Sequence, residues 1–305
     1  MKTTEYSDLP SELIDEIFDV LWDITYDERA LLRNCLPVST DFRHRIMSRF
    51  CSFVYLSDDS DRGVILRKLI SRPPDSRLDG IGRYIEHFSL ILHPPDQEGD
   101  VSDSGITRQL MHDSDLVAIV EGLYGDDFGV TEFSLTIPTE CLVGLSALWT
   151  DLPASFRSAF QSLLHSPYLT RLNLENIAVP VRIFRGSFLE DLSIEHASIL
   201  GLVDITPEIQ ELDPVPVSVS PFPSLVTLCA DYSHEFYSTP FPDSMLDKLK
   251  IFTEVPNKIS SSERTWHILG VSASSLTEIS IDHTGELQCH PLSAEMTEAK
   301  FPCHR

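Results

Sequence analysis

The side chains that most resemble a metal site are the pairs Cys289-His290 and Cys303-His304 near the end of the 305-residue chain. Thiolate and imidazole are the ligands that zinc prefers in proteins. In most zinc sites, however, about two to four residues separate the two ligands of one segment, so that both turn toward the ion. Directly adjacent ligands do not fit this spacing. We therefore interpret the segment as a loosely ordered tail that holds no metal.

Other residues capable of chemistry are scattered along the chain. Asp58, Asp59 and Asp61 could attract calcium, but the loop lacks the acid that completes a calcium site, and a solvated acidic turn fits it better. The eleven histidines occur singly, without a nucleophile elbow, a phosphate-binding loop or a His-Glu-x-x-His string. We predict a protein that is not an enzyme and has no cofactor. The alternative is a hydrolase whose catalytic groups meet only in the folded chain.

Composition excludes several classes of partner. The chain has 23 Lys+Arg against 47 Asp+Glu, and its formal net charge of -24 repels the phosphates of nucleic acids and anionic lipids. Its six cysteines are too sparse for a disulfide scaffold, no N-glycosylation sequon occurs, and the N-terminus lacks the apolar core of a secretory signal. The longest uncharged run, residues 214–230, contains four prolines. We predict an intracellular protein, cytoplasmic or nuclear, that binds neither nucleic acid nor membrane.

Three short helices are predicted at the N-terminus. Ser11 can cap the first helix, whose acidic side chains lie opposite its apolar ones. The second helix begins near Asp27 and ends at Pro37, because proline lacks the amide that a continuing helix needs. The third begins near residue 39 or 40 and has an apolar side chain at every fourth position. These positions are Phe42, Ile46 and Phe50.

The order of residues in this segment resembles an F-box. The pattern is Leu9-Pro10-x-Glu12-Leu13-Ile14-x-Glu16-Ile17-Phe18-x-x-Leu21, followed by Leu31, Leu32, Cys35, Val38-Ser39 and Phe42-Arg43, and it covers residues 9 to about 54. F-boxes are three-helix modules that bind the small Skp-type adaptor of cullin-RING ubiquitin ligases, while the rest of the chain selects the substrate. The resemblance implies an adaptor-binding surface made of Leu9, Pro10, Leu13, Ile14, Ile17, Phe18, Leu21, Cys35, Val38 and Phe42.

A short apolar motif recurs after residue 55, in which an apolar residue is followed by others three and five positions later. The side chains of the last two positions lie on one face of a strand, and the side chain of the first points inward from the preceding turn. Such strands resemble those of leucine-rich repeats. The motifs are Ile85/Phe88/Leu90, Val130/Phe133/Leu135, Leu169/Leu172/Leu174, Leu189/Leu192/Ile194, Leu225/Leu228, Leu246/Leu249/Ile251 and Leu276/Ile279/Ile281.

Helices are predicted before several of these strands, over residues 115–123, 151–164 and 263–269. A repeated helix and strand is typical of a solenoid, in which stacking buries the apolar face that one unit leaves exposed. The motif starts are 45, 39, 20, 36, 21 and 30 residues apart, so the expected solenoid is irregular. Asn176 lies one position short of the asparagine of many repeats, so no side-chain ladder is predicted. The alternative is an ordinary α/β domain.

Two segments rich in proline, serine and acids, residues 94–105 and 204–223, are predicted as loops that serve as spacers or bind a substrate. The predicted fold is an α/β chain with a short N-terminal three-helix F-box-like module, residues 1–54, followed by an irregular leucine-rich repeat-like α/β solenoid, residues 55–305. The resemblance implies a non-catalytic substrate receptor that joins a Skp-type adaptor to an unknown protein client. The acidic body favours a basic or neutral client. The alternative function is a stand-alone interaction scaffold, in which the helical module only caps the repeats.

Overall fold

The computed structural model of the chain describes residues 16, 40–57, 62–70, 80–92, 113–138, 147–149, 152–200, 221–231, 241–255, 262–281 and 289–291. The chain divides into two compact units, Met1–Ser52 and Phe53–Arg305, which we describe separately. In the first unit, helix α3 spans Thr40–Cys51, where the sequence predicts the third helix. Glu16 is helical and exposed. The rest of the first two predicted helices lies outside the described residues.

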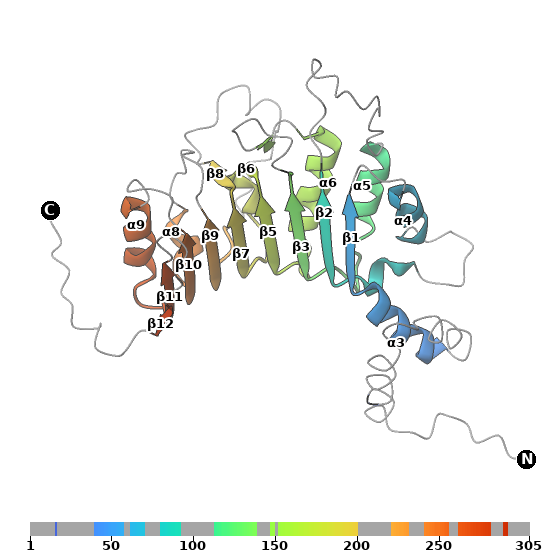
Figure 1. Cartoon of the computed structure of the whole chain (residues 1–305), viewed down its shortest axis with the longest axis horizontal. Coiled ribbons are helices and arrows are strands. Elements are labelled where there is room, and N and C mark those ends of the chain that lie inside the picture. The colour runs from blue at the N-terminus through green and yellow to red at the C-terminus, as the bar shows by residue number, and fades with distance from the viewer. Residues whose placement is uncertain are drawn as a thin grey trace, which may run out of the picture. The chain divides into compact units, whose positions relative to one another are not determined.

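The second unit is built on a nine-stranded sheet. Eight strands are parallel and follow one another across the sheet in chain order (Figure 1), and β12 closes the series antiparallel to β11. This confirms the predicted α/β class and specifies a mostly parallel sheet. The strands are Phe53–Ser57 (β1), His87–Ile91 (β2), Glu132–Thr136 (β3), Arg171–Glu175 (β5), Asp191–Glu195 (β7), Thr227–Asp231 (β9), Ile251–Val255 (β10), Glu278–Ile281 (β11) and Cys289–Pro291 (β12).

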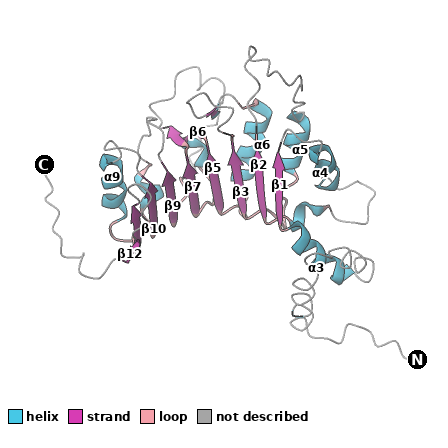
Figure 2. Cartoon of the chain, viewed as in Figure 1, coloured by secondary structure: helices cyan, strands magenta, loops and turns pink. Residues whose placement is uncertain are grey.

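Helices cover one face of this sheet (Figure 2). The α-helices are Arg62–Ile70 (α4), Asp113–Glu121 (α5), Ala154–Leu164 (α6), Asp243–Leu246 (α8) and Ser262–Ser272 (α9), and the 3-10 helices are Ile81–Tyr84 (η2) and Val181–Phe184 (η5). Helices α5, α6 and α9 lie where the sequence predicts helices. Three short strands form a second parallel sheet in the order β4, β6, β8, with bounds Ala147–Leu148, Ile177–Pro180 and Ser198–Leu200. None of the described helices has the length and apolar character needed to cross a membrane.

The recurring apolar motif places buried side chains of adjacent strands in register, facing the helices. One aligned row contains Phe88, Phe133, Leu172, Leu192, Leu228 and Phe252, and a second contains Leu90, Leu135, Leu174, Ile194, Ala230 and Glu254. The strands therefore pair in the same way although the segments between them differ in length. The irregular intervals noted in the sequence are taken up by these connections.

The motif assigned to Leu246, Leu249 and Ile251 is wrong by three residues, because the residues that align with the neighbouring motif are Leu249, Phe252 and Glu254. Strand β10 begins at Ile251, and its side chains in the two buried rows are Phe252 and Glu254. The carboxylate of Glu254 lies where the neighbouring strands have an apolar residue. Apolar spacing alone therefore does not mark the motif of β10. Glu254 is buried, and its Oε2 accepts a hydrogen bond from the Thr265 hydroxyl of α9 at 2.5 Å.

An aromatic cluster joins helix α6 to the sheet. Phe160 is fully buried, and its ring centroid lies 5.4 Å from that of Phe133, 5.5 Å from Trp149 and 6.0 Å from Phe156. Phe133 in turn lies 5.8 Å from Phe88 on β2. The edge-to-face contact of Phe160 with Phe133 is a favourable geometry for aromatic rings. This cluster makes α6 and strands β2 and β3 one packed core.

After strands β5 and β7, the chain leaves the main sheet through a residue in the left-handed backbone conformation. Asn176 (φ 58°) joins β5 to β6, and His196 (φ 48°) follows β7 shortly before β8. Asn176 is buried, and its side-chain amide donates to the carbonyl oxygen of Ile137 at 2.8 Å. Asparagine tolerates this backbone conformation better than most residues. The Asn176 side chain, for which the sequence predicts no ladder, therefore links the end of β5 to the residue that follows β3.

We expect Gly82→Ala to lower the free energy of unfolding by about 1–3 kcal/mol, because the fold leaves no room for a methyl group there. Gly82 is buried in η2, and an added Cβ would overlap the carbonyl oxygen of Gly122 at the end of α5. Gly270→Ala is the matched control, since no atom lies within 4 Å of its added Cβ. This exposed helical change should be neutral or stabilise by up to about 1 kcal/mol. Urea denaturation of both variants checks this, and equal stabilities would contradict it.

Candidate functional site

The face of the main sheet opposite the helices is the candidate binding surface. Along strands β2, β3 and β5, buried side chains alternate with partly or fully exposed ones, as expected for a sheet that packs on helices by one face. No described helix of the second unit lies over the other face (Figure 2). We call this surface the open face. Its side chains are available to a ligand.

Parallel register arranges the open-face residues in three rows that cross the strands. The N-terminal row is Phe53, His87, Glu132, Arg171, Asp191, Thr227 and Ile251; the central row is Tyr55, Ser89, Ser134, Asn173, Ser193, Cys229 and Thr253; the C-terminal row is Ser57, Ile91, Thr136, Glu175, Glu195 and Asp231. Neighbouring strands lie about 4.8 Å apart. One extended ligand can therefore contact several members of a row.

The N-terminal row holds a chain of ion pairs. Nδ1 of His87 lies 3.1 Å from Oε2 of Glu132, within hydrogen-bond distance. The Arg171 guanidinium lies 3.4 Å from the same oxygen and 3.5 Å from Oδ2 of Asp191. Asn173 in the central row donates to Oε1 of Glu132 at 3.0 Å. Because 52% of the Arg171 side chain is exposed, its pairs contribute at most about 1 kcal/mol each, and they mainly orient the side chains.

The C-terminal row is acidic. Glu175 and Glu195 are paired in register on neighbouring strands, and Asp231 follows in register on β9. The Thr136 hydroxyl donates to Oε2 of Glu175 at 2.9 Å and so holds that carboxylate. Among the described residues, no lysine, arginine or histidine forms an ion pair with Glu175 or Glu195. This row therefore presents negative charge at the C-terminal ends of the strands.

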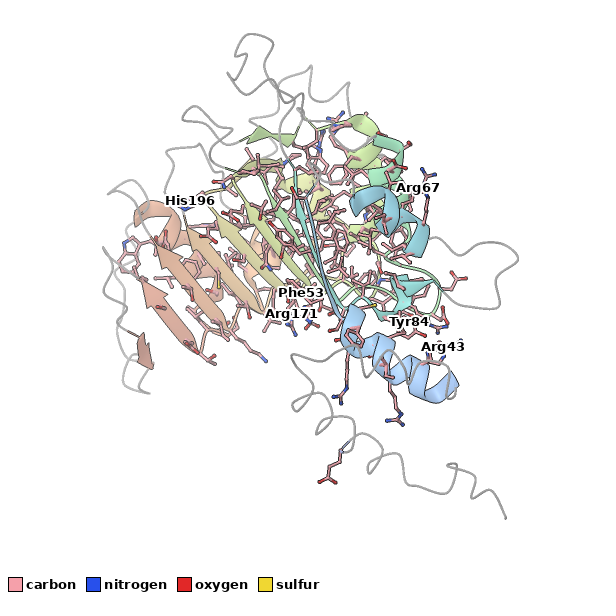
Figure 3. The ribbon with its side chains drawn as sticks, turned by 45° about the vertical axis from the view of Figure 1, so that its right-hand side comes forward. Arg43, Phe53, Arg67, Tyr84, Arg171 and His196 are labelled. Atoms are coloured by element: carbon pink, nitrogen blue, oxygen red, sulfur yellow. The ribbon has the colours of Figure 1, made fainter. Side chains whose placement is uncertain are left out.

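The edge strand β1 adds two exposed aromatic side chains. Phe53 is 63% exposed and Tyr55 57% exposed, and register with β2 places both on the open face. Figure 3 shows Phe53 with Arg171 at the N-terminal ends of the strands and His196 near the opposite ends. Of the seven large apolar side chains exposed among the described residues, five belong to β1 and α4. Phe53 and Tyr55 lie on the open face and the three of α4 on the helix-covered side, so only the two aromatic side chains add an apolar contact to the open face.

From β2 to β10, the central row has polar side chains and one thiol. Serine occupies three of its positions, on β2, β3 and β7, and Cys229 lies on β9. Burial raises the pKa of the Cys229 thiol, and the negative charge of Asp191 raises it further, whereas a hydrogen bond with Thr253 acts in the opposite direction. The thiol therefore stays protonated at neutral pH.

Most of the adaptor-binding residues predicted from the sequence lie outside the described residues. Leu9, Pro10, Leu13, Ile14, Ile17, Phe18, Leu21, Cys35 and Val38 all belong to this group. Phe42 is the exception, and it lies in the first turn of α3. The adaptor surface therefore remains a prediction from sequence.

The residues weighed for metal binding are not brought together in the described part of the chain. Cys289 and His290 belong to β12, whereas Cys303, His304 and the acidic residues 58–61 lie outside the described residues. Within the described ranges, no group of three or more histidine, cysteine or carboxylate side chains is placed to hold a metal ion. His165, one of the scattered histidines, has Nε2 at 2.9 Å from the carbonyl oxygen of Arg185.

The open-face residues were not predicted from the sequence. A usable signal was present, since Glu132, Asn173, Glu175 and Asp191 each lie directly beside an apolar motif residue. Once the motifs are accepted as parallel strands, these polar positions must lie side by side on the opposite face. The edge strand β1 was missed because the sequence motif was followed only from Ile85 onward.

No protein-family model matches the chain, and neither its sequence nor its structure has a match among curated proteins and solved structures.

Proposed function

We propose that this protein is a substrate receptor of a cullin-RING ubiquitin ligase. Its N-terminal segment binds a Skp-type adaptor, and its repeat-like body holds a protein client on the open face. The protein performs no chemistry itself. Tethering a client beside the ligase's transfer subunit raises the effective concentration of the reacting groups, which accelerates transfer without a new catalytic site.

The observation that carries the proposal is the residue pattern of the N-terminal segment. A Leu-Pro start is followed by a predicted helix with apolar side chains at Leu13, Ile14, Ile17 and Phe18, and the Cys35-x-x-Val38-Ser39 stretch follows downstream. Two separate parts of the F-box pattern occur at the expected distance from each other. Helix α3, which contains Phe42, agrees with the third helix of such a module.

The arrangement of the second unit supports a leucine-rich repeat-like solenoid as its finer description. Its parallel strands pair in chain order, and the apolar residues of each motif stack in register on those of the next. Helices α4, α5 and α6 fill the connections on one face. Stacked units of this kind leave a broad sheet face for a protein partner.

Co-elution of the purified chain with a Skp-type adaptor in size-exclusion chromatography tests the proposal. We expect a 1:1 complex with the wild-type chain and loss of that complex with the Leu9→Ala/Pro10→Ala double variant. Both substitutions leave the second unit untouched, so circular dichroism should show an unchanged sheet content. A folded, monodisperse wild-type chain that forms no complex would contradict the ligase role and leave the stand-alone scaffold as the function.

A further inference from the structure

We propose that the open face binds an extended client segment that carries an apolar side chain and, about five to seven residues away, two or more lysine or arginine side chains. The inference rests on the proposed function in that it takes the open face as the client site. It adds the chemistry of the client and the order of its contacts along the sheet.

Charge complementarity is the first argument. The described carboxylates of the open face include Glu132, Glu175, Asp191 and Glu195, and they outnumber its cationic groups. Arg171 is already placed between Glu132 and Asp191. Negative charge therefore remains in the C-terminal row, at Glu175 and Glu195. A cationic side chain of a ligand can pair with these carboxylates without breaking an ion pair of the protein.

The aromatic side chains of β1 are the second argument. Phe53 and Tyr55 are two residues apart and therefore lie on the same face of β1, the open face, and each exposes more than half of its area. Apolar area left in water is costly, so a ligand with an apolar side chain gains by covering these rings. Aromatic rings also suit the aliphatic stems of long cationic side chains. The apolar contact thus lies at the β1 edge, separate from the acidic row.

The distance from the aromatic side chains of β1 to the acidic row sets how many ligand residues must separate the apolar side chain from the cationic ones. Three steps across the sheet lead from β1 to β5, which carries Glu175, and four lead to β7, which carries Glu195. The carboxylates also lie two residues along the strands from Tyr55 and four from Phe53, so at about 4.8 Å a step and 3.3 Å a residue the spans are about 16 and 20 Å from Tyr55 and about 20 and 23 Å from Phe53. An extended chain advances about 3.3 Å per residue, so about five to seven residues separate the apolar side chain from the cations.

Other occupants fit the same surface less well. Nucleic acid would place its phosphates against the carboxylates of the C-terminal row, which costs rather than gains electrostatic energy. A second copy of the chain brings a net charge of -24 against the same charge. A basic segment of a protein client satisfies both the acidic row and the aromatic edge.

Fluorescence anisotropy with synthetic peptides tests the proposal on the full chain. The probe is a fluorescein-labelled peptide of serine and glycine with one phenylalanine and, about five and seven residues away, two lysines. A second peptide carries glutamates in place of the lysines, and a third places both lysines directly beside the phenylalanine. We expect the first peptide to bind about tenfold or more tightly than the other two at low salt, and the difference to shrink as salt rises.

Two variants of the protein locate the contacts. Glu175→Lys/Glu195→Lys should weaken the lysine peptide about tenfold or more and should bind the glutamate peptide in its place. Phe53→Ala/Tyr55→Ala should weaken binding of the lysine peptide and of the glutamate peptide by the same factor, because both peptides carry the phenylalanine. The matched control is Glu121→Lys/Asp247→Lys, which makes the same charge change at exposed positions outside the open face and should change neither affinity more than about twofold.

The outcomes separate this inference from the proposed function. Equal binding of all three peptides, or an equal effect of the control variant, would overturn the client chemistry. A peptide that is not bound by a chain that still co-elutes with the adaptor would overturn it as well and leave the receptor role intact. Selective peptide binding by a chain that forms no adaptor complex would instead support the client chemistry and contradict the ligase role.

Discussion

Replacing Phe160 by alanine is expected to lower the free energy of unfolding by about 3–5 kcal/mol, the range for a large aromatic side chain removed from a packed core. The ring is fully buried and contacts Phe133, Trp149 and Phe156. Its loss opens a cavity that strands β2 and β3 and helix α6 cannot refill without moving. Urea denaturation followed by circular dichroism measures the change.

Phe188→Ala is the matched control, because it removes the same side chain from a position that is 54% exposed. Surface substitutions of this kind usually change stability by less than about 0.5 kcal/mol. Similar losses in the two variants would mean that the aromatic cluster around α6 is not the core of the second unit.

The second large effect concerns the adaptor. We expect Ile17→Asp to abolish binding of a Skp-type adaptor, because the complex would then bury a carboxylate without a partner at a cost of several kcal/mol. Each 1.4 kcal/mol corresponds to about tenfold in affinity, so a loss of about a hundredfold or more is expected. Isothermal titration calorimetry with the wild-type chain and the variant measures the loss.

The neighbouring Glu16 supplies the control. It is helical and exposed, so Glu16→Lys alters charge on the same predicted helix without placing it in the predicted apolar surface. This variant should bind the adaptor with nearly wild-type affinity. Full binding by a folded Ile17→Asp variant would contradict the predicted interface.

Local periodicity made much of the second unit predictable from sequence. Helices α5, α6 and α9 appear where apolar residues recur at helical spacing, and the motif at Leu172 and Leu174 marks a strand with two buried positions. These signals lie within single segments. Because each motif leucine faces the helices, the same short string identifies the strand and its buried face at once.

The remaining features depend on residues far apart in the chain. Glu254 lies in a buried row, where its carboxylate accepts a hydrogen bond from Thr265 of α9, so no apolar pattern marks that position. Asn176 acquires its role from the carbonyl group of Ile137, 39 residues earlier. The ion pairs of the open face likewise require the register of β2, β3, β5 and β7, which a single-segment pattern does not contain. The adaptor surface, with only Phe42 among the described residues, stays a prediction.

The chain-order pairing of the strands also determines how this protein gives way under mechanical load. No strand of the main sheet crosses over a neighbour, so each makes its backbone hydrogen bonds only with the strands just before and after it. A force applied at the C-terminal end would detach β12 first, then β11 and β10, and each release would leave the remaining pairs intact. The molecule would unfold strand by strand and lengthen in unequal steps set by the lengths of its connecting segments, instead of unfolding in one cooperative event.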